Sequence, residues 1–392
     1  MSALASPAIP VVAWARSPVA PVGGALSRLQ PHEIAAPLAQ ALLARAGLPA
    51  AAVDAVVLGN ALGAGGNPAR MLALAAGLPD SCPAYSVDTQ CCAGLDAITL
   101  ACALLASGQA QIVLAGGAEA WSRAPIRQHR PLSPGDSAQA YERPAFAPWP
   151  ERDPDMLQAA ADHAAQIRCL RAQQDAYAQA SHARAVAARD DLRAEIIALQ
   201  GLDHDAYPRL LRSDRLARLP VAASVLAPGA ADCALSTLAI SAKADGAALL
   251  LLATPAACRQ WGLQPAALWR GGVSVGVAPE MPLRGAAQAV RALLGRLALG
   301  AADIHRWELH DAFAVQALAF CAELGLAPES LNLQGGGLAR GHPIGASGAV
   351  AAVRVLAQLQ AMAQPGGPQR GLACIAGAGG LGAAALFESL PA

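Results

Sequence analysis

"CCAGLDAITLACALLASGQAQIVLAGGAEA", residues 91–120, decides the fold, because it joins one apolar helix to one apolar strand that enters a glycine turn. Its first half predicts a helix from about residue 91 to residue 107, and its second half predicts a strand over 111–120. A similar unit returns near the C-terminus, where "ASGAVAAVRVLAQLQAM" (346–362) predicts a helix and "ACIAGAGGLGAAA" (373–385) predicts two strands around a glycine turn. Two copies of one α/β unit, packed as a pseudo-dimer, would explain this repeat.

The segments that precede this unit also alternate between strand and helix patterns. "AIPVVAWA" (8–15) and "AVVLGNAL" (55–62) predict strands, and residues 31–48 between them carry apolar residues at helical spacing. The alternation stops after residue 120 and returns at "DGAALLLLATP" (245–255). This order predicts a parallel or mixed α/β sheet.

Residues 121–243 interrupt the alternation and predict a lid over the α/β body. They begin with a Pro-rich polar loop and continue with a charged helix over 171–196. Long insertions of this kind on a rigid scaffold often cover a binding site. We therefore predict one α/β half from residues 1–120 and 244–262, a lid from residues 121–243, and a second α/β half from residues 263–392.

The composition excludes several classes of partner. The 392 residues are 55% hydrophobic and 14% charged, with a formal net charge of zero, so no basic excess is available to neutralise a nucleic acid. The most apolar run, Gly246–Cys258, is shorter than the roughly 20 residues that a membrane span requires. The nine cysteines are odd in number and scattered, which is typical of reduced thiols. We expect a cytoplasmic protein with no nucleic-acid or membrane partner and no metal site.

Cys91 is the candidate nucleophile. It lies where a predicted strand ends and a predicted helix begins, and the small residues Ala93 and Gly94 leave its approach open. The positive end of a helix favours a thiolate, so this position predicts a lowered pKa for the Cys91 thiol. The alternative is a buried structural cysteine, which is our interpretation of the neighbouring Cys92.

Two histidines accompany this cysteine in the pattern. His342 lies in "LQGGGLARGHPIGASGAV" (333–350), between a glycine and a proline, and His310 ends the strand predicted in "IHRWELHDAF" (304–313). Each histidine has an ordinary alternative: the ring of His342 could be satisfied by the backbone, and His310 could pair with Asp311 or cap a helix. Together with Cys91, the two histidines would make a nucleophile, its base and a donor to an oxyanion, which suits acyl transfer through a thioester.

Several segments of the chain resemble, in this order, the signature segments of thiolases, the family of acetyl-CoA acetyltransferases and 3-ketoacyl-CoA thiolases. The resemblance extends from about residue 9 to residue 388. The segments are "GGNPARM" (65–71), "CCAGLDAITLACALLASGQAQIVLAGGAEAWSRAP", "RAQQDAYAQASHARAVAARDDLRAEI", "HDAFAVQALAF", "NLQGGGLARGHPIGASGA" and the closing glycine hairpin.

The resemblance implies an α/β thiolase fold, in which two similar βαβαβαββ halves form five αβαβα layers below a loop domain. It also implies coenzyme A thioesters as substrates without a further cofactor, a place in fatty acid metabolism, and a homodimer or homotetramer.

The resemblance also assigns roles to individual residues. Cys91 matches the cysteine that accepts the acyl group, and His342 matches the histidine that activates it. Ser241 matches the serine that contacts the pantetheine of coenzyme A. Gly380 lies in the terminal glycine turn, which together with the N–H of Cys91 is implied to hold one substrate oxyanion, while His310 and His342 hold the other.

The chain departs from the family pattern at two cysteines. The segment His310–Phe313 resembles that of the sterol-carrier-protein type of thiolase, but Ala312 occupies the place of its cysteine. In the C-terminal Cys-x-Gly segment, matching without gaps puts Ala376 at the place of the second acid/base cysteine, and Cys374 lies two residues early. A strand two residues shorter with a turn two residues longer would restore Cys374 to that role, so both registers remain open.

Three functions follow from these residues. The first is a thiolase-type acyltransferase that cleaves a 3-ketoacyl-CoA or condenses acyl-CoA through an acylated Cys91, with Cys374 as the candidate second base. The second is a condensing enzyme similar to ketosynthases, or an acyl-CoA hydrolase, that uses Cys91, His310 and His342 alone. The third is a non-catalytic binding or scaffold protein with a degenerate thiolase fold.

Overall fold

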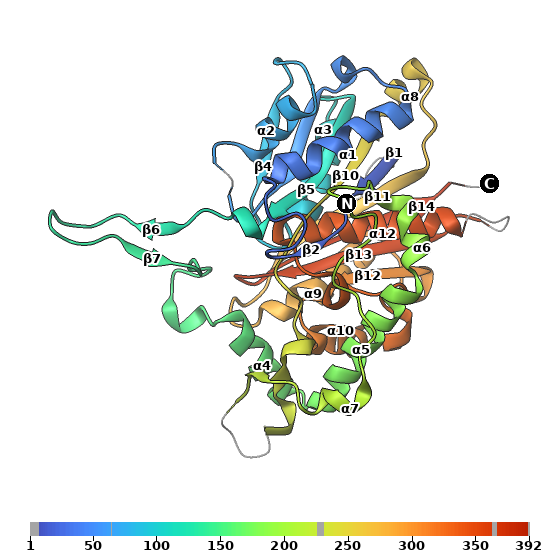
Figure 1. Ribbon diagram of the computed structural model, residues 1–392. Helices are drawn as coiled ribbons and strands as arrows, with labels where there is room; N and C mark the ends of the chain where they lie inside the picture. Colours follow the sequence, from blue (N-terminus) through green and yellow to red (C-terminus); the bar gives the residue numbers. More distant parts are fainter. Residues whose placement is uncertain (1–7, 64, 226–230, 363–366, 391–392) are drawn as a thin grey trace.

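The computed structural model describes residues 8–63, 65–225, 231–362 and 367–390 and is built on one long sheet (Figure 1). Nine strands follow one another across this sheet, and β2 (Ala20–Pro21) pairs with β10 beside them. Their order is β12 (Arg306–His310), β13 (Arg370–Gly377), β14 (Leu381–Ser389), β11 (Ala267–Gly276), β1 (Ile9–Arg16), β10 (Ala244–Ala253), β5 (Ile112–Ala120), β3 (Ala55–Gly59) and β4 (Ala84–Val87).

The sheet consists of two halves with the same strand order. Strands β4, β3, β5, β10 and β1 form the first half, in which β3 is parallel to β4 and β5 and the remaining pairs are antiparallel. Strands β12, β13, β14 and β11 repeat this pattern, and a parallel bridge from Leu331 to Trp307 stands where the first half has β4. The halves join through three residue pairs between β1 and β11. The repeat that the sequence predicted is confirmed.

Helices cover the two halves in five layers. In the middle layer, α3 (Ala93–Ala106) and α12 (Ser347–Ala361) pack between the halves. The outer face of the first half carries α1 (Pro31–Ala46), α2 (Pro68–Ala75) and α8 (Pro255–Trp261). The outer face of the second half carries α9 (Gly285–Leu297) and α10 (Ala314–Leu324). This arrangement confirms the predicted αβαβα fold.

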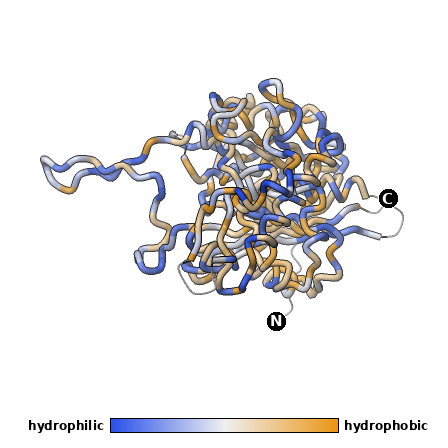
Figure 2. Tube along the Cα trace, turned by 60° about the horizontal axis from the view of Figure 1, so that its bottom comes forward, coloured by the Kyte–Doolittle hydropathy of each residue, from blue (hydrophilic) through white to orange (hydrophobic). Residues whose placement is uncertain are grey.

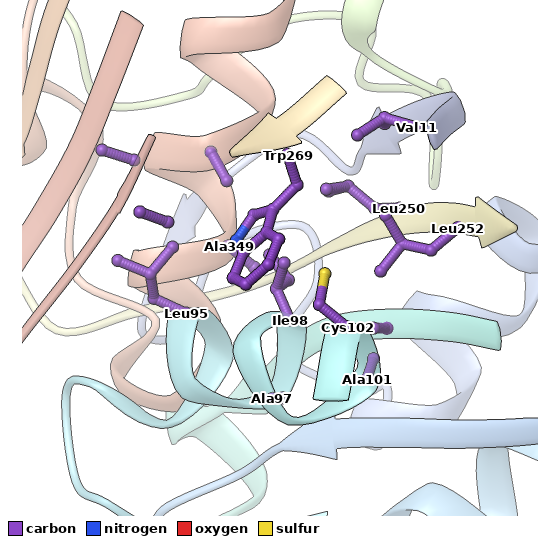
Figure 3. Close-up of a cluster of buried hydrophobic side chains, with 14 of the residues drawn as sticks. Val11, Leu95, Ala97, Ile98, Ala101, Cys102, Leu250, Leu252, Trp269 and Ala349 are labelled. Atoms are coloured by element: carbon purple, nitrogen blue, oxygen red, sulfur yellow. The ribbon is translucent and has the colours of Figure 1, made fainter. Parts of the chain in front are cut away.

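The middle layer is a dense apolar core made from both halves. Figure 3 shows Trp269 of β11 against Ile98 of α3 and Ala349 of α12, with Leu250 and Leu252 of β10 beside them. All five side chains are buried. Removing this apolar surface from water is the main stabilising contribution to the contact between the halves.

The segment between β5 and β10 is an insertion of helices and short strands, for which we keep the name lid from the sequence-based prediction. Its helices are α4 (Met156–Gln166), α5 (Arg171–Ala187), α6 (Arg189–Leu192) and α7 (Ser213–Leu216), and its short strands are β6 (Arg127–His129), β7 (Gln139–Tyr141), β8 (Val221–Ala223) and β9 (Leu235–Ser236). Helices α4 and α5 pack on α10 of the second half, and α5 also packs on the short helix α11 (Gly337–Arg340). The β6–β7 hairpin extends away from the body (Figures 1 and 2).

Buried ion pairs tie the lid to both halves. Arg16 of β1 lies 2.6 Å from both Glu195 and Asp205 of the lid. Glu195 also binds Arg354 of α12. All four side chains are almost fully buried, so the loss of one partner would leave an uncompensated charge in the interior.

Some elements differ from the sequence-based expectation. The charged helix predicted over 171–196 is interrupted at Ala188 and continues as the short helix α6. Helix α9 was not predicted, although it packs on β14 and β11. One helical segment, Ile344–Ala361, is long and apolar enough to cross a membrane, but 78% of it is buried inside the protein, as in a core helix.

Gly94 of α3 lies at a close contact between the central helical segments, and substituting it tests whether this close approach is required. A Cβ at this position would lie 2.7 Å from the carbonyl oxygen of Gly345, whereas a Cβ at Gly295 of α9 would meet no atom within 4 Å. We expect Gly94→Ala to lower the free energy of unfolding by about 1–3 kcal/mol through overpacking. Gly295→Ala should raise it by up to about 1 kcal/mol through helix propensity. Urea unfolding of both variants measures these changes, and equal stability of the two would contradict the close-contact explanation.

Candidate active site

The candidate site lies where the N-termini of the two central helices meet. Besides Gly94, Gly348 at the start of α12 makes this contact, because a Cβ there would lie 2.8 Å from the Cβ of Leu95. Side chains at these positions would push α3 and α12 apart. The glycines therefore bring together the two segments that carry Cys91 and His342.

Cys91 and His342 form a hydrogen-bonded pair. The Cys91 Sγ lies 3.3 Å from the Nε2 of His342, although 251 residues separate them in the chain. Cys91 is presented by a sharp turn, in which Gln90 adopts a left-handed backbone conformation with φ 55°. The amide N–H of Gln90 donates to Asp88 Oδ1 at 2.9 Å and supports this turn. The structure thus brings together the nucleophile and the base that the sequence predicted.

The hydrogen bonds around His342 define its tautomer. The Ser347 hydroxyl donates to the carbonyl oxygen of Pro343 at 2.9 Å, and it lies 2.7 Å from Nδ1 of His342. Because the hydroxyl proton is already used, the Ser347 oxygen accepts a hydrogen bond from the Nδ1–H of His342. The lone pair of Nε2 is then directed at the Cys91 thiol, as a general base requires.

His310 is the third member of the cluster. Its ring centroid lies 4.2 Å from that of His342, and its Nε2 is buried without a hydrogen-bond partner among the described residues. The alternative pairing with Asp311 does not occur, because that carboxylate accepts from Tyr177 Oη at 3.1 Å and from the N–H of Leu338 at 3.3 Å. An unpartnered ring nitrogen beside the pair can contact a substrate oxygen.

Loss of solvation favours the neutral form of all three groups, although Cys91 and His342 are only partly buried. Together with the nearby charges of Glu119 and Asp88, it raises the pKa of the Cys91 thiol to about 11. Burial lowers the pKa of His342 to about 4, and the pKa of His310 falls well below its usual value for the same reason. The lowered thiol pKa that we predicted for Cys91 is therefore wrong, because loss of solvation outweighs the two backbone N–H groups that favour the thiolate.

The backbone N–H of Ala378 is one of those two groups, and the other is the N–H of Cys91 itself. Ala378 lies in the turn between β13 and β14, so the terminal turn does reach the thiol as predicted. Gly380 has a different role there: its φ of 79° continues the turn, and its carbonyl oxygen accepts from the N–H of Val277 at 2.7 Å. The sequence indicated the correct turn but missed Ala378.

Cys374 is not brought to the Cys91–His342 pair. Cys374 lies beside Leu309 in the ladder of β12 and β13, whereas His310 lies beside Ile375. Successive side chains of a strand point to opposite faces, so Cys374 and His310 are on opposite faces of the sheet. Cys374 is fully buried in the apolar cluster under α9 and α10, with Cys321 among its members. This placement argues against Cys374 as the second acid/base.

Ser241 and Cys92 have structural contacts. The Ser241 hydroxyl donates to the carbonyl oxygen of Gly337 at 2.6 Å, and the Ser241 amide donates to that of Ala312 at 2.8 Å. These bonds join the end of the lid to the loop that leads to His342. Cys92 is buried, and its thiol faces the carbonyl oxygen of Ile375 at 3.8 Å, as expected for a structural cysteine.

The sequence did not single out Glu119, a buried charged residue beside the site. Glu119 is the penultimate residue of strand β5, within the "GGAEA" segment, and its carboxylate accepts hydrogen bonds from both halves of the molecule. The sequence signal that could have identified Glu119 is a charged residue inside an otherwise apolar strand. Among the described residues, no group of three or more His, Cys, Asp or Glu side chains is arranged to hold a metal ion.

Two protein-family models cover almost the whole described chain. The model of the thiolase N-terminal domain matches residues 9–256, and the model of the thiolase C-terminal domain matches residues 263–389.

Curated proteins and solved structures agree with these matches. The chain is 37% identical to "Putative acetyl-CoA C-acetyltransferase YhfS" of Bacillus subtilis, over 94% of this chain and 95% of that protein. It is 36% identical to "Putative acetyl-CoA C-acetyltransferase VraB" of Staphylococcus haemolyticus, over 96% and 98%.

The crystal structure of the Bacillus anthracis acetyl-CoA acetyltransferase superposes with a TM-score of 0.88 at 30% identity, covering 98% of this chain and 100% of that one. The structure of Acat5 thiolase from Ascaris suum in complex with coenzyme A gives the same TM-score and coverage at 27% identity. With both halves matched in sequence and in structure, the chain belongs to the thiolase family, as its sequence predicted.

Proposed function

We propose that this thiolase-family protein is an acyltransferase that takes an acyl group from a coenzyme A thioester onto Cys91. The observation that carries the proposal is the 3.3 Å contact between the Cys91 thiol and the Nε2 of His342. The names of the related acetyl-CoA C-acetyltransferases and the coenzyme A bound to the Ascaris suum thiolase support the substrate class.

The proposed first half-reaction uses groups that are already in place. His342 Nε2 takes the proton of Cys91 while the sulfur attacks the thioester carbonyl, so a free thiolate is not needed beforehand. The N–H groups of Cys91 and Ala378 are near the sulfur and would bind the oxyanion that develops on the carbonyl. His342 then returns the proton to the departing coenzyme A thiol. A neutral resting pair suits this sequence of proton transfers.

Acylation of Cys91 is the direct test. We expect intact-protein and peptide mass spectra to show one acetyl group on the Cys91 peptide after incubation with acetyl-CoA. Cys91→Ala should abolish the adduct, and His342→Ala should slow its formation by about 10²–10⁴-fold, the usual contribution of a general base. Cys374→Ala is the matched control and should acylate like the parent chain. Absence of any adduct on Cys91 would refute the proposed function.

The second half-reaction has two candidate forms. Thiolytic cleavage and Claisen condensation both require a proton transfer at the carbon next to a thioester. The thiol of the adjacent Cys92 faces the carbonyl oxygen of Ile375, and Cys374 lies on the opposite face of its sheet from His310, which argues against either thiol for this transfer. The two histidines are weak bases, because burial lowers the pKa of each. This observation favours the alternative in which the second substrate is a malonyl-type thioester.

In the malonyl-type alternative, no base is needed to remove a proton from the carbon next to the thioester. The bond between the carbon and its carboxylate breaks, CO2 leaves, and the electron pair forms an enolate that attacks the acyl-Cys91 carbonyl. The C–S bond then breaks and releases the Cys91 thiolate, which takes a proton from solvent. The unpartnered Nε2 of His310 can stabilise the enolate oxygen if it carries the proton.

Acetyl-CoA and malonyl-CoA distinguish these forms. If decarboxylation supplies the enolate, an acetyl-Cys91 enzyme should give acetoacetyl-CoA and CO2 with malonyl-CoA, and no condensation with acetyl-CoA alone. His310→Ala should lower this rate without preventing acetylation of Cys91. Chromatographic detection of acetoacetyl-CoA is the measurement. Formation from acetyl-CoA alone would instead favour the thiolase reaction, and acetate as the sole product would indicate hydrolysis.

We also propose that the protein is a cytoplasmic homodimer or homotetramer. Support comes from β4 at the edge of the sheet, where Tyr85 is 50% exposed, and from Met71 and Leu74 of the adjacent α2, which are 42% and 44% exposed. An exposed strand edge with apolar neighbours can pair with a second copy. Light scattering should therefore give two or four times the 39.5 kDa of one chain. A monomer at micromolar concentration would contradict this expectation.

A further inference from the structure

The carboxylate of Glu119 joins the two halves of the protein at the candidate site. Its Oε2 accepts from the N–H of Ala61 at 2.8 Å and of Leu62 at 3.3 Å, both in the loop after β3. The same oxygen accepts from the N–H of Gly345 at 3.0 Å, in the turn that begins α12. Its Oε1 accepts from the side chain of Asn60 at 2.7 Å. One buried side chain thus binds two backbone segments that belong to different halves.

All these partners are hydrogen-bond donors, and they suit an ionised carboxylate. Glu119 is fully buried, and no arginine or lysine forms an ion pair with it among the described residues. Burial raises the pKa of Glu119 to about 7, and the N–H groups of Ala61, Gly345 and Leu62 oppose that rise. An unpaired buried carboxylate is unfavourable for folding, so its presence at this position calls for a functional explanation.

The Gly345 turn is directly connected to His342. It lies between His342 and Ser347, the residue that accepts from the His342 Nδ1. From the other side, the Trp121 indole N–H donates to the carbonyl oxygen of His342 at 3.0 Å. Trp121 follows Glu119 by two residues, so the end of β5 holds the His342 segment at two points. Space is tight here, since a Cβ at Gly345 would lie 2.9 Å from the Glu119 Oε2.

We propose that Glu119 is a positioning residue: by holding the Gly345 turn against the 60–62 loop, its carboxylate keeps His342 Nε2 at hydrogen-bond distance from the Cys91 thiol. This inference rests on the proposed roles of Cys91 and His342. Glu119 does not touch the sulfur or a substrate, and it acts only through the placement of His342.

The negative charge of Glu119 and its positioning role have opposite effects on the rate of Cys91 alkylation, so an experiment can separate them. The negative charge raises the pKa of the Cys91 thiol, so electrostatics alone predicts that Glu119→Gln would speed alkylation of Cys91. Loss of His342 placement predicts slower alkylation, since the thiol then lacks its base. The sign of the change separates the two effects.

The experiment is a double-mutant cycle on Cys91 alkylation by iodoacetamide at pH 8, followed by peptide mass spectrometry. We expect Glu119→Gln to slow alkylation at least about tenfold, as displacement of a catalytic group by about 1 Å can do. In the His342→Ala background, Glu119→Gln should cause no further slowing. Where acyl transfer is measurable, kcat should fall in Glu119→Gln with KM for the acyl-CoA nearly unchanged.

Two further variants keep the result interpretable. Glu388→Gln is the matched control, because Glu388 is also a buried carboxylate but lies at the end of β14 remote from the 378–380 turn, and it should alkylate like the parent chain. Gly345→Ala displaces the same turn while leaving Glu119 intact, and it should slow alkylation in the same way if Glu119→Gln fails to fold.

The inference would be overturned if Glu119→Gln alkylates at the parent rate or faster, or if it slows alkylation equally in the His342→Ala background. Failure of the proposed function is distinguishable, because iodoacetamide reports on the Cys91–His342 contact without any acyl-CoA. If Cys91 is never acylated, the double-mutant cycle of alkylation rates can still be measured and interpreted.

Discussion

The contact between the N-termini of α3 and α12 is the constraint on which the rest of the structure depends. Two similar α/β halves each contribute one central helix, and the helices meet at their first turns, where only glycines fit. The segment before α3 carries Cys91 and the segment before α12 carries His342, so packing the halves also assembles the catalytic pair. The interface that stabilises the protein therefore also positions these two residues, because the apolar middle layer in Figure 3 packs the two helices against each other.

Burial at this interface determines the charge state of the site. A thiol at the start of a helix would be acidic in full contact with solvent, but Cys91 is partly buried, and loss of solvation raises its pKa to about 11. The same loss keeps both histidines neutral. The site is therefore suited to moving a proton during attack rather than to storing a thiolate, which also protects Cys91 from oxidation at rest.

The sequence predicted most of the fold because hydrophobic periodicity is local. Strands such as β5 and β10 and the helices α1, α3 and α12 lie within a few residues of their predicted bounds. The sequence singled out Cys91, His342 and His310, which the structure brings together, because unusual residues lie at strand and helix ends. The prediction was wrong about the direction of the Cys91 pKa shift and left the register of Cys374 open, since solvation and strand register depend on neighbours that are distant in sequence.

The sequence by itself determined the repeated α/β unit and the family, and it singled out the candidate nucleophile and base, because these depend on residue type and spacing. Only the tertiary structure decided which backbone groups face the thiol, that Ala378 and not Gly380 is one of them, and that Cys374 lies on the opposite face of its sheet. It also showed that Glu119 holds both halves together at the site. The physical reason is that hydrogen bonds and desolvation arise between segments that only the packed halves bring into contact.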